Sequence, residues 1–358
     1  MTHLYNYQHN GEDILGVAFS PDEKKVVTTS KDVRVWNFSL LSDPTSMNDS
    51  RDANICIQFS GDRKYLITTN GGSIKLWDVV NEKPQKKIFI HEDLTLVTTF
   101  SEDISKVATA IWEEWRSLYI YDIEKDQEIF LRWDGYALSD TKIIFSPDAR
   151  FLAITHYVDV SVYIYDIDQR KKIIGLKGTG QATAIVFSPD GQRIAISFAS
   201  GEVKVWDTLH YNQLFLLRDH LQVQEDEGVG IESLSVSSDS SLIALGATNG
   251  TIYLYSLGNG QLFDILKGQS RSISSAYFSP NNQFLASYDS AGFIEIWQLN
   301  QANCSVLKII YHFLHPVDAF CWRDNDHIVL ASKGGSDGIP HFYQLTLEVN
   351  EAIQGENG

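Results

Sequence analysis

One short sequence pattern recurs along this chain of 358 residues and constrains its fold more than any other feature. In each copy, an apolar run ends in Phe-Ser or a similar pair, and a turn follows. A later apolar run ends in Trp-Asp or a similar pair. The openings are Phe19-Ser20, Phe59-Ser60, Phe100-Ser101, Phe145-Ser146, Phe187-Ser188, Val236-Ser237, Phe278-Ser279 and a degenerate Trp322-Arg323. The closings begin at Trp36, Trp77, Tyr121, Tyr165, Trp206, Tyr255, Trp297 and Tyr343. Openings spaced 40 to 49 residues apart indicate one supersecondary unit repeated eight times.

Each unit reads as four short strands, named a, b, c and d here. In the fifth unit, apolar runs at 184–187, 193–196, 203–206 and 214–217 predict them. Pro189-Asp190-Gly191 predicts the a–b turn, because Pro presets φ and Gly accepts a positive φ. Such a unit, closing on Trp-Asp, is typical of a propeller blade. The chain resembles the WD40-repeat family over nearly all of its length, which implies an all-β ring of four-stranded antiparallel blades.

The eight openings predict eight blades, with seven as the alternative. Residues 2–7 stand at the same offset before Phe19 as strand d at 261–266 does before Phe278, and the last unit ends after strand c near Leu347. We therefore expect one closed β-propeller over residues 1–349, whose N-terminal strand completes the last blade and removes open edges. Residues 42–52 predict a loop or a frayed edge instead of strand d, and residues 350–358 predict a disordered tail.

The family pattern is incomplete in this chain. Many blades of the family carry a buried hydrogen-bonded set: a His before strand a, a Ser or Thr on b, an Asp in the b–c turn and the Trp on c. The His position is filled only by His91, and the turn Asp is replaced by Gly71, Ser200, Asn249 and Ala291. We expect apolar packing and the aromatic residue of strand c to hold the blades together.

Composition narrows the choice of partners and compartment. The chain has 29 Lys and Arg against 46 Asp and Glu, a formal net charge of −17, which argues against binding a nucleic-acid backbone. No run of 18 apolar residues predicts a membrane span, and the N-terminus lacks a signal-peptide pattern. Its three cysteines form no spaced framework, so we expect reduced thiols and a cytoplasmic protein.

The candidate partner site comes from the longest loops. In the family, b–c and d–a loops share one face of the ring, and a–b and c–d turns share the other. Two long b–c loops and the d–a loop between them carry the candidate residues Trp112, Trp115, Arg116, Trp133, Tyr136, His156 and Tyr157. Trp, Tyr and Arg together are typical of an interaction hot spot. The alternative is that individual aromatics cap the core between blades.

In three other segments, the residue pattern favours an ordinary structural interpretation over a binding site. The insertion at 219–230 carries four acidic side chains and reads as a solvated loop, although it could meet a basic partner. The last unit contains His312, His315, His327 and His341, but a metal needs three or four convergent ligands, so we expect none. The glycines at 334–338 lack the Gly-Lys-Ser/Thr ending of a phosphate loop and predict a b–c loop.

The resulting hypothesis is a non-enzymatic scaffold that docks a protein or peptide through one loop face within a larger complex, with no catalytic residues and no cofactor. The alternative is a propeller enzyme or small-ligand sensor with its site in the central channel. That alternative predicts convergent polar residues at the inner ends of strands a. Those strands are mostly Val, Ala, Ile, Leu and small residues, which favours the scaffold.

Overall fold

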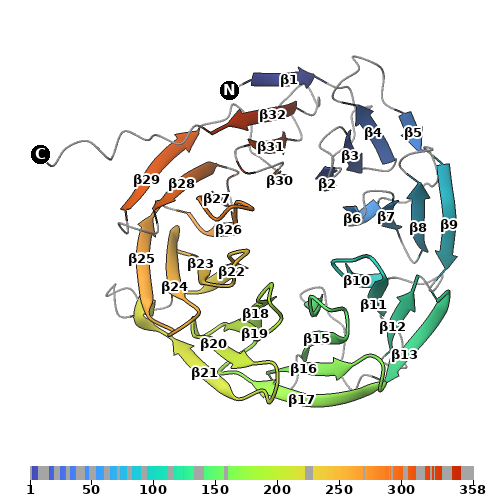
Figure 1. Ribbon diagram of the computed structural model, residues 1–358, viewed down its shortest axis with the longest axis horizontal. Coiled ribbons are helices and arrows are strands. Elements are labelled where there is room, and N and C mark those ends of the chain that lie inside the picture. The colour runs from blue at the N-terminus through green and yellow to red at the C-terminus, as the bar shows by residue number, and fades with distance from the viewer. Residues whose placement is uncertain are drawn as a thin grey trace, which may run out of the picture.

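The computed structural model describes residues 2–6, 16–19, 25–29, 33–37, 45–47, 54–59, 65–70, 73–78, 83–89, 95–111, 117–123, 125–132, 141–156, 160–221, 229–268, 271–289, 291, 293–300, 305–311, 319–322, 325, 327–332 and 341–347. Within these ranges the strands form eight four-stranded antiparallel sheets. The sheets stand around a central opening as the blades of a propeller (Figure 1). We number them blades 1 to 8 in chain order.

Every blade runs from an innermost strand a to an outermost strand d. The a strands are β2 (Gly16–Phe19), β6 (Asn54–Phe59), β10 (Thr95–Phe100), β14 (Ile143–Phe145), β18 (Ala182–Phe187), β22 (Ile231–Val236), β26 (Ile273–Phe278) and β30 (Ala319–Trp322). The b strands are β3 (Lys25–Thr29), β7 (Tyr65–Asn70), β11 (Lys106–Ile111), β15 (Phe151–His156), β19 (Arg193–Phe198), β23 (Leu242–Ala247), β27 (Phe284–Asp289) and β31 (His327–Ser332). The c strands are β4 (Val33–Asn37), β8 (Ser73–Asp78), β12 (Ser117–Asp122), β16 (Ser161–Asp166), β20 (Val203–Asp207), β24 (Thr251–Ser256), β28 (Ile294–Asn300) and β32 (His341–Thr346). The d strands are β5 (Thr45–Met47), β9 (Lys83–Phe89), β13 (Gln127–Arg132), β17 (Lys171–Lys177), β21 (Gln213–Leu217), β25 (Leu262–Lys267), β29 (Ser305–Tyr311) and β1 (Thr2–Asn6).

The two ends of the chain meet in blade 8. Strand β1 pairs antiparallel with β32, with Thr2 opposite Gln344 and Asn6 opposite His341. Figure 1 shows β1 on the outer edge of the sheet that β30, β31 and β32 begin. Strand β2 of blade 1 also contacts β30. The predicted eight blades, and the completion of the last one by the N-terminal strand, are confirmed.

Blade 1 departs from the expectation for residues 42–52. A short strand, β5, forms there and pairs with β4, with Thr45 opposite Val35 and Met47 opposite Val33. The prediction of a loop is therefore wrong for these three residues, and the other residues of 42–52, to which the alternative of a frayed edge applies, lie outside the described ones. An outermost strand needs a partner on only one side, so backbone pairing suffices where the side chains read poorly as a strand. Residues 350–358 lie outside the described residues.

The core lies in the seams between blades. At the seam of blades 4 and 5, Ala153 and Leu176 pack against Phe187, Phe198 and Trp206. All six residues of β23 are buried, because a b strand is covered by a neighbouring blade on each face. Three of the seven residues of β17 are instead intermediate or buried, and its remaining four are exposed at the outer rim. Burial of both sheet faces explains why the inner strands read as continuous apolar runs.

The aromatic residue of strand c stabilises the blades mainly by packing, as expected. Trp206 is 5% exposed and lies edge-on to Phe198, with ring centroids 6.5 Å apart. One part of the family's polar set remains in blade 2, where Trp77 Nε1 donates to Thr68 Oγ1 over 2.9 Å. In blade 5 the position equivalent to Thr68 is Ile196, which is fully buried. Packing has replaced the hydrogen bond there.

The Phe-Ser opening of each repeat leads into the a–b turn, and this turn is built in the same way in blades 3 to 7. In blade 5 the Ser188 hydroxyl donates to Asp190 Oδ1 over 2.5 Å and accepts from Arg193 N over 2.9 Å. Asp190 Oδ1 also accepts from Gln192 N over 2.9 Å. The residue three after the Ser has a positive φ, and Gly191 takes this position at +68°, as predicted. We call Ser101, Ser146, Ser188, Ser237 and Ser279 the turn serines.

The closing Asp has an equivalent task in the c–d turn. Asp122 Oδ1 accepts from Lys125 N over 2.9 Å, and Asp166 Oδ1 accepts from Gln169 N over 2.8 Å. Asp207 accepts from His210 N and Asn212 N over 2.6 and 2.8 Å. These bonds satisfy backbone donors that the tight turn leaves without a strand partner. The Trp-Asp signature therefore combines a seam-filling ring with a turn-forming carboxylate.

Removing residues 1–10 deletes β1 and leaves β32 as an open edge, so we expect the melting temperature to fall by several degrees and aggregation to increase. Differential scanning calorimetry and light scattering measure both effects. A synthetic peptide of residues 1–10, added in excess, should restore part of the loss. An unchanged melting curve would show that β1 does not close the ring in solution.

Replacing Trp206 by Ala leaves a cavity in the seam between blades 4 and 5. We expect it to lower the free energy of unfolding by about 3–5 kcal/mol, measured by denaturant titration. Leu209→Ala in the same blade is the control, because that side chain is 80% exposed and should cost less than about 0.5 kcal/mol. Equal effects of the two substitutions would contradict the strand register.

The turn carboxylates predict a loss of stability in acid. Burial alone would raise the pKa of Asp103, Asp190 and Asp239, but hydrogen bonds from the turn serines and backbone N–H groups outweigh burial and lower it. A lowered folded pKa stabilises the protein above the unfolded value, and that contribution is lost as the pH falls below about 4. We expect Asp190→Asn to weaken this acid dependence of the melting temperature, since Asn281 builds the same turn in blade 7. Identical pH profiles would refute this role.

Candidate functional site

The described residues place the anchor points of the predicted aromatic loops on one face. Strand β11 ends at Ile111, just before Trp112, and β12 begins at Ser117, just after Arg116. Ser117 pairs with Arg132, after which Trp133 and Tyr136 follow. Antiparallel pairing therefore brings the start of the d–a loop beside the end of the b–c loop in blade 3. The neighbouring blade 4 presents its b–c loop on the same face.

Most of the predicted site residues lie outside the described residues. These are Trp112, Trp115, Arg116, Trp133, Tyr136 and Tyr157. His156 is the last residue of β15, and its backbone pairs with Ser161 at the mouth of the blade 4 b–c loop. The assignment of these seven residues to a partner site stays a prediction.

The described residues of two other candidate segments form a short helical turn and a regular strand pair. In the 219–230 insertion, Asp219–Leu221 forms a 3-10 turn, and Leu221 packs on the seam of blades 5 and 6. In the last blade, His327 pairs with Thr346 and His341 with Ser332, which places the two His at opposite ends of a six-residue strand pair. That separation is about 17 Å. These two His residues therefore cannot share one metal ion.

On the opposite face, the innermost strands of blades 3, 4 and 5 surround a cavity of about 350 Å³. It lies where β10, β14 and β18 enter their a–b turns. Its lining includes Thr99 and Glu102 from blade 3, Ile144 and Pro147 from blade 4, and Ile185 and Pro189 from blade 5. A cavity of this volume is large enough to accept a bulky side chain or a small ligand.

The cavity lining is mostly apolar, and Thr99, Glu102 and Ser146 supply its polar side chains. Glu102 is the one charged residue among the described residues that line it, and its side chain is exposed. The Ser146 hydroxyl in the lining is held by Asp148 Oδ1 and Phe151 N. These groups suit the binding of a partly apolar ligand.

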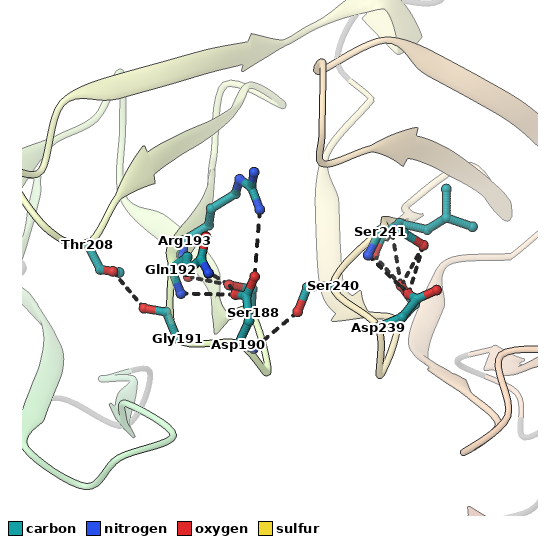
Figure 2. Close-up of polar contacts among 11 residues, drawn as sticks. Ser188, Asp190, Gly191, Gln192, Arg193, Thr208, Asp239, Ser240 and Ser241 are labelled. Atoms are coloured by element: carbon teal, nitrogen blue, oxygen red, sulfur yellow. Dashed lines mark hydrogen bonds and ion pairs between the residues drawn. The ribbon is translucent and has the colours of Figure 1, made fainter.

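Neighbouring turns bond to each other further round the same face. Asp190 N in blade 5 donates to Ser240 Oγ in blade 6 over 3.1 Å, as Figure 2 shows. Ser238 N in blade 6 donates to Asn282 Oδ1 in blade 7 over 2.8 Å, and its hydroxyl donates to Pro280 O over 2.9 Å. We call this set the turn belt. Each acceptor side chain belongs to the residue three after a turn serine.

The turn face carries a negative field. Asp103, Asp148 and Asp190 lie exposed in the three turns beside the cavity. The field also affects Tyr211 in the c–d turn of blade 5. Burial raises the pKa of Tyr211 to about 12, and the charges of Asp148 and Asp166 contribute to the rise. A cationic group would therefore be stabilised near this face.

Other classes of site receive no support from the described residues. Among them, no group of three or more His, Cys, Asp or Glu side chains is arranged to hold a metal ion. In the same ranges, no helix is long and apolar enough to span a membrane.

The cavity was missed by reasoning from sequence, although one signal was present. The residue after the turn serine is Pro147 in blade 4 and Pro189 in blade 5, but Glu102 in blade 3. That substitution is visible in the aligned openings. The substitution bears on the cavity because the three positions, far apart in the sequence, line it together.

Comparisons with known proteins agree with this architecture. The family model described as WD domain, G-beta repeat matches residues 1–37, 46–78, 170–207 and 260–298. Periodic tryptophan protein 2 of Arabidopsis thaliana is 20% identical over 72% of this chain and 30% of its own length. Target of rapamycin complex subunit wat1 of Schizosaccharomyces pombe is 27% identical over 44% of this chain and 63% of its own length. The chain thus spans less than two thirds of each of these relatives.

A solved structure extends the likeness to the whole ring. Sqt1 of Chaetomium thermophilum, crystallised with the N-terminus of ribosomal protein L10, matches with a TM-score of 0.74 and 17% identity. The match covers 96% of this chain and 99% of the Sqt1 chain. At this identity the likeness concerns the fold. Together with the repeated Phe-Ser and Trp-Asp elements, the eight four-stranded blades and the matched repeats, it leads to one conclusion: the chain belongs to the WD40-repeat family.

Proposed function

We propose that this protein is a non-enzymatic cytoplasmic scaffold that docks protein or peptide partners through its b–c and d–a loop face within a larger complex. The observation that carries the proposal is the closed ring, whose apolar seams fix the strand ends from which these loops extend. WD40 propellers are typically protein-interaction scaffolds. Two relatives fit that pattern: Sqt1 was crystallised with a ribosomal-protein segment, and wat1 is a complex subunit by name.

The contact surface that we propose is formed by Trp112, Trp115, Arg116, Trp133, Tyr136, His156 and Tyr157. Rigid support favours binding, because less conformational freedom is lost when the partner docks. Strands β11 and β12 supply that support: Ala108, Ala110, Leu118 and Ile120 between them are fully buried in the seam with blade 4. Aromatic residues presented on such a base offer a large contact area at low entropic cost.

The test is a double substitution, Trp112→Ala with Trp115→Ala, in the full chain. We expect the melting temperature to stay near that of the wild type and capture of partners to be lost, since central aromatic anchors typically contribute about 2 kcal/mol or more each. Affinity purification from the native cell, followed by mass spectrometry, identifies the partners. Binding of a purified partner is then measured for each variant.

Two controls define the outcomes. Phe130→Ala removes a 47% exposed aromatic from the outer strand β13 of the same blade and should leave capture intact. Neutralising Glu225, Asp226 and Glu227 should have a smaller effect that shrinks with added salt. If the double Trp variant unfolds, the two residues are core caps, and if it folds and captures partners normally, the contact surface lies elsewhere.

A further inference from the structure

Among the described turns, the cavity on the turn face lies where the side-chain hydrogen bonds that join neighbouring turns in blades 5 to 7 are missing. In blades 6 and 7 the residues three after the turn serines are Ser240 and Asn282, whose side chains form the turn belt. In blades 3, 4 and 5 the same positions hold Ile104, Ala149 and Gly191, which have no side-chain acceptor. The described cavity lies among these three blades.

A second turn position determines the chemistry of the cavity. The residues that follow the turn serines in blades 3, 4 and 5 are Glu102, Pro147 and Pro189, and all three line the cavity. The two prolines and the neighbouring Ile144 and Ile185 provide apolar walls. Glu102 places a carboxylate at the blade 3 edge of those walls.

The charge of Glu102 is not balanced by a described neighbour. Among the residues that the structure describes, Glu102 forms no ion pair, and the bases near these turns have other acidic partners. Arg150 pairs with Asp166 over 3.2 Å, and Arg193 lies 3.9 Å from Asp190. The positive charge of Lys106 helps to lower the pKa of Asp103. An acceptor for a cation therefore stands directly beside an apolar cavity.

We propose that this cavity is a second binding site, separate from the loop face, which takes a peptide segment with a large apolar side chain next to a Lys or Arg. The apolar side chain would enter between Pro147, Pro189 and Ile144, and the cation would meet the Glu102 carboxylate. The cavity volume suits one bulky side chain. The Glu102 carboxylate in the lining, the exposed Asp148 of the blade 4 turn and the net charge of −17 favour a basic segment over an acidic one.

The test uses a phage-displayed library of random 12-residue peptides. The library is first depleted on the Glu102→Lys variant and then selected on the wild-type protein. We expect enriched peptides that carry a large apolar residue beside Lys or Arg. One enriched peptide is synthesised with a fluorophore, and its dissociation constant is measured by fluorescence anisotropy.

Three variants identify the binding site of that peptide. Glu102→Pro restores the residue found in blades 4 and 5, so the turn should form, and binding should weaken about tenfold. Glu128→Lys makes the same charge change as Glu102→Lys on the exposed outer strand β13 of the same blade, and binding should stay within about twofold of wild type. The Trp112→Ala, Trp115→Ala protein should also bind normally, because its substitutions lie on the opposite face.

Four results would overturn the proposal: no enrichment, enrichment of acidic peptides, equal binding to wild type and Glu102→Pro, or loss of binding only in the double Trp variant. The last result would place the peptide on the loop face, so the turn-face site would fail while the proposed scaffold function remained. Loss of partner capture in the double Trp variant, with the anisotropy result intact, would support both sites.

Discussion

The structure depends on the burial of each blade between two neighbours. An inner strand such as β23, with all six residues buried, has apolar side chains on both faces, and neither face can be satisfied within its own sheet. A linear row of such blades would leave an uncovered face at each end. The contact of β2 with β30 and the pairing of β1 with β32 remove both, since they join the two ends of the chain in one closed ring. The positions of all loops and turns follow from that closure.

Each a–b turn has constant positions, which recur from blade to blade, and variable positions. The turn serine and the Asp two residues later satisfy the backbone groups of the turn, so these residues serve the fold. The side chains one and three after the serine have no such task. They join turns to each other in blades 5 to 7, and the side chain one after the serine lines a cavity in blades 3 to 5. A repeat protein can in this way vary its surface chemistry without altering the repeated frame.

The two faces of the ring offer different chemistry. The loop face has the longer connections and the aromatic-rich sequences, which fit the docking of a folded partner or peptide. The turn face has short connections, a negative field and an apolar cavity with a carboxylate at its edge. Antiparallel strand order keeps the two sets of connections at opposite ends of every blade. Partners on the two faces could therefore bind at the same time.

Sequence alone predicted eight blades, with seven as the alternative, together with the strand order and closure by residues 2–7, because Phe-Ser openings and aromatic closings recur at a nearly constant spacing even where single residues vary. It also predicted the burial of Trp206 and the turn at Gly191. It failed at β5, where backbone pairing at an outer edge outweighed weak strand propensity. Glu102, Pro147 and Pro189 are more than 40 residues apart, and no local pattern connects them. Only the tertiary structure brings them to one cavity, because the distance between blades is set by side-chain packing in the seams and not by position along the chain.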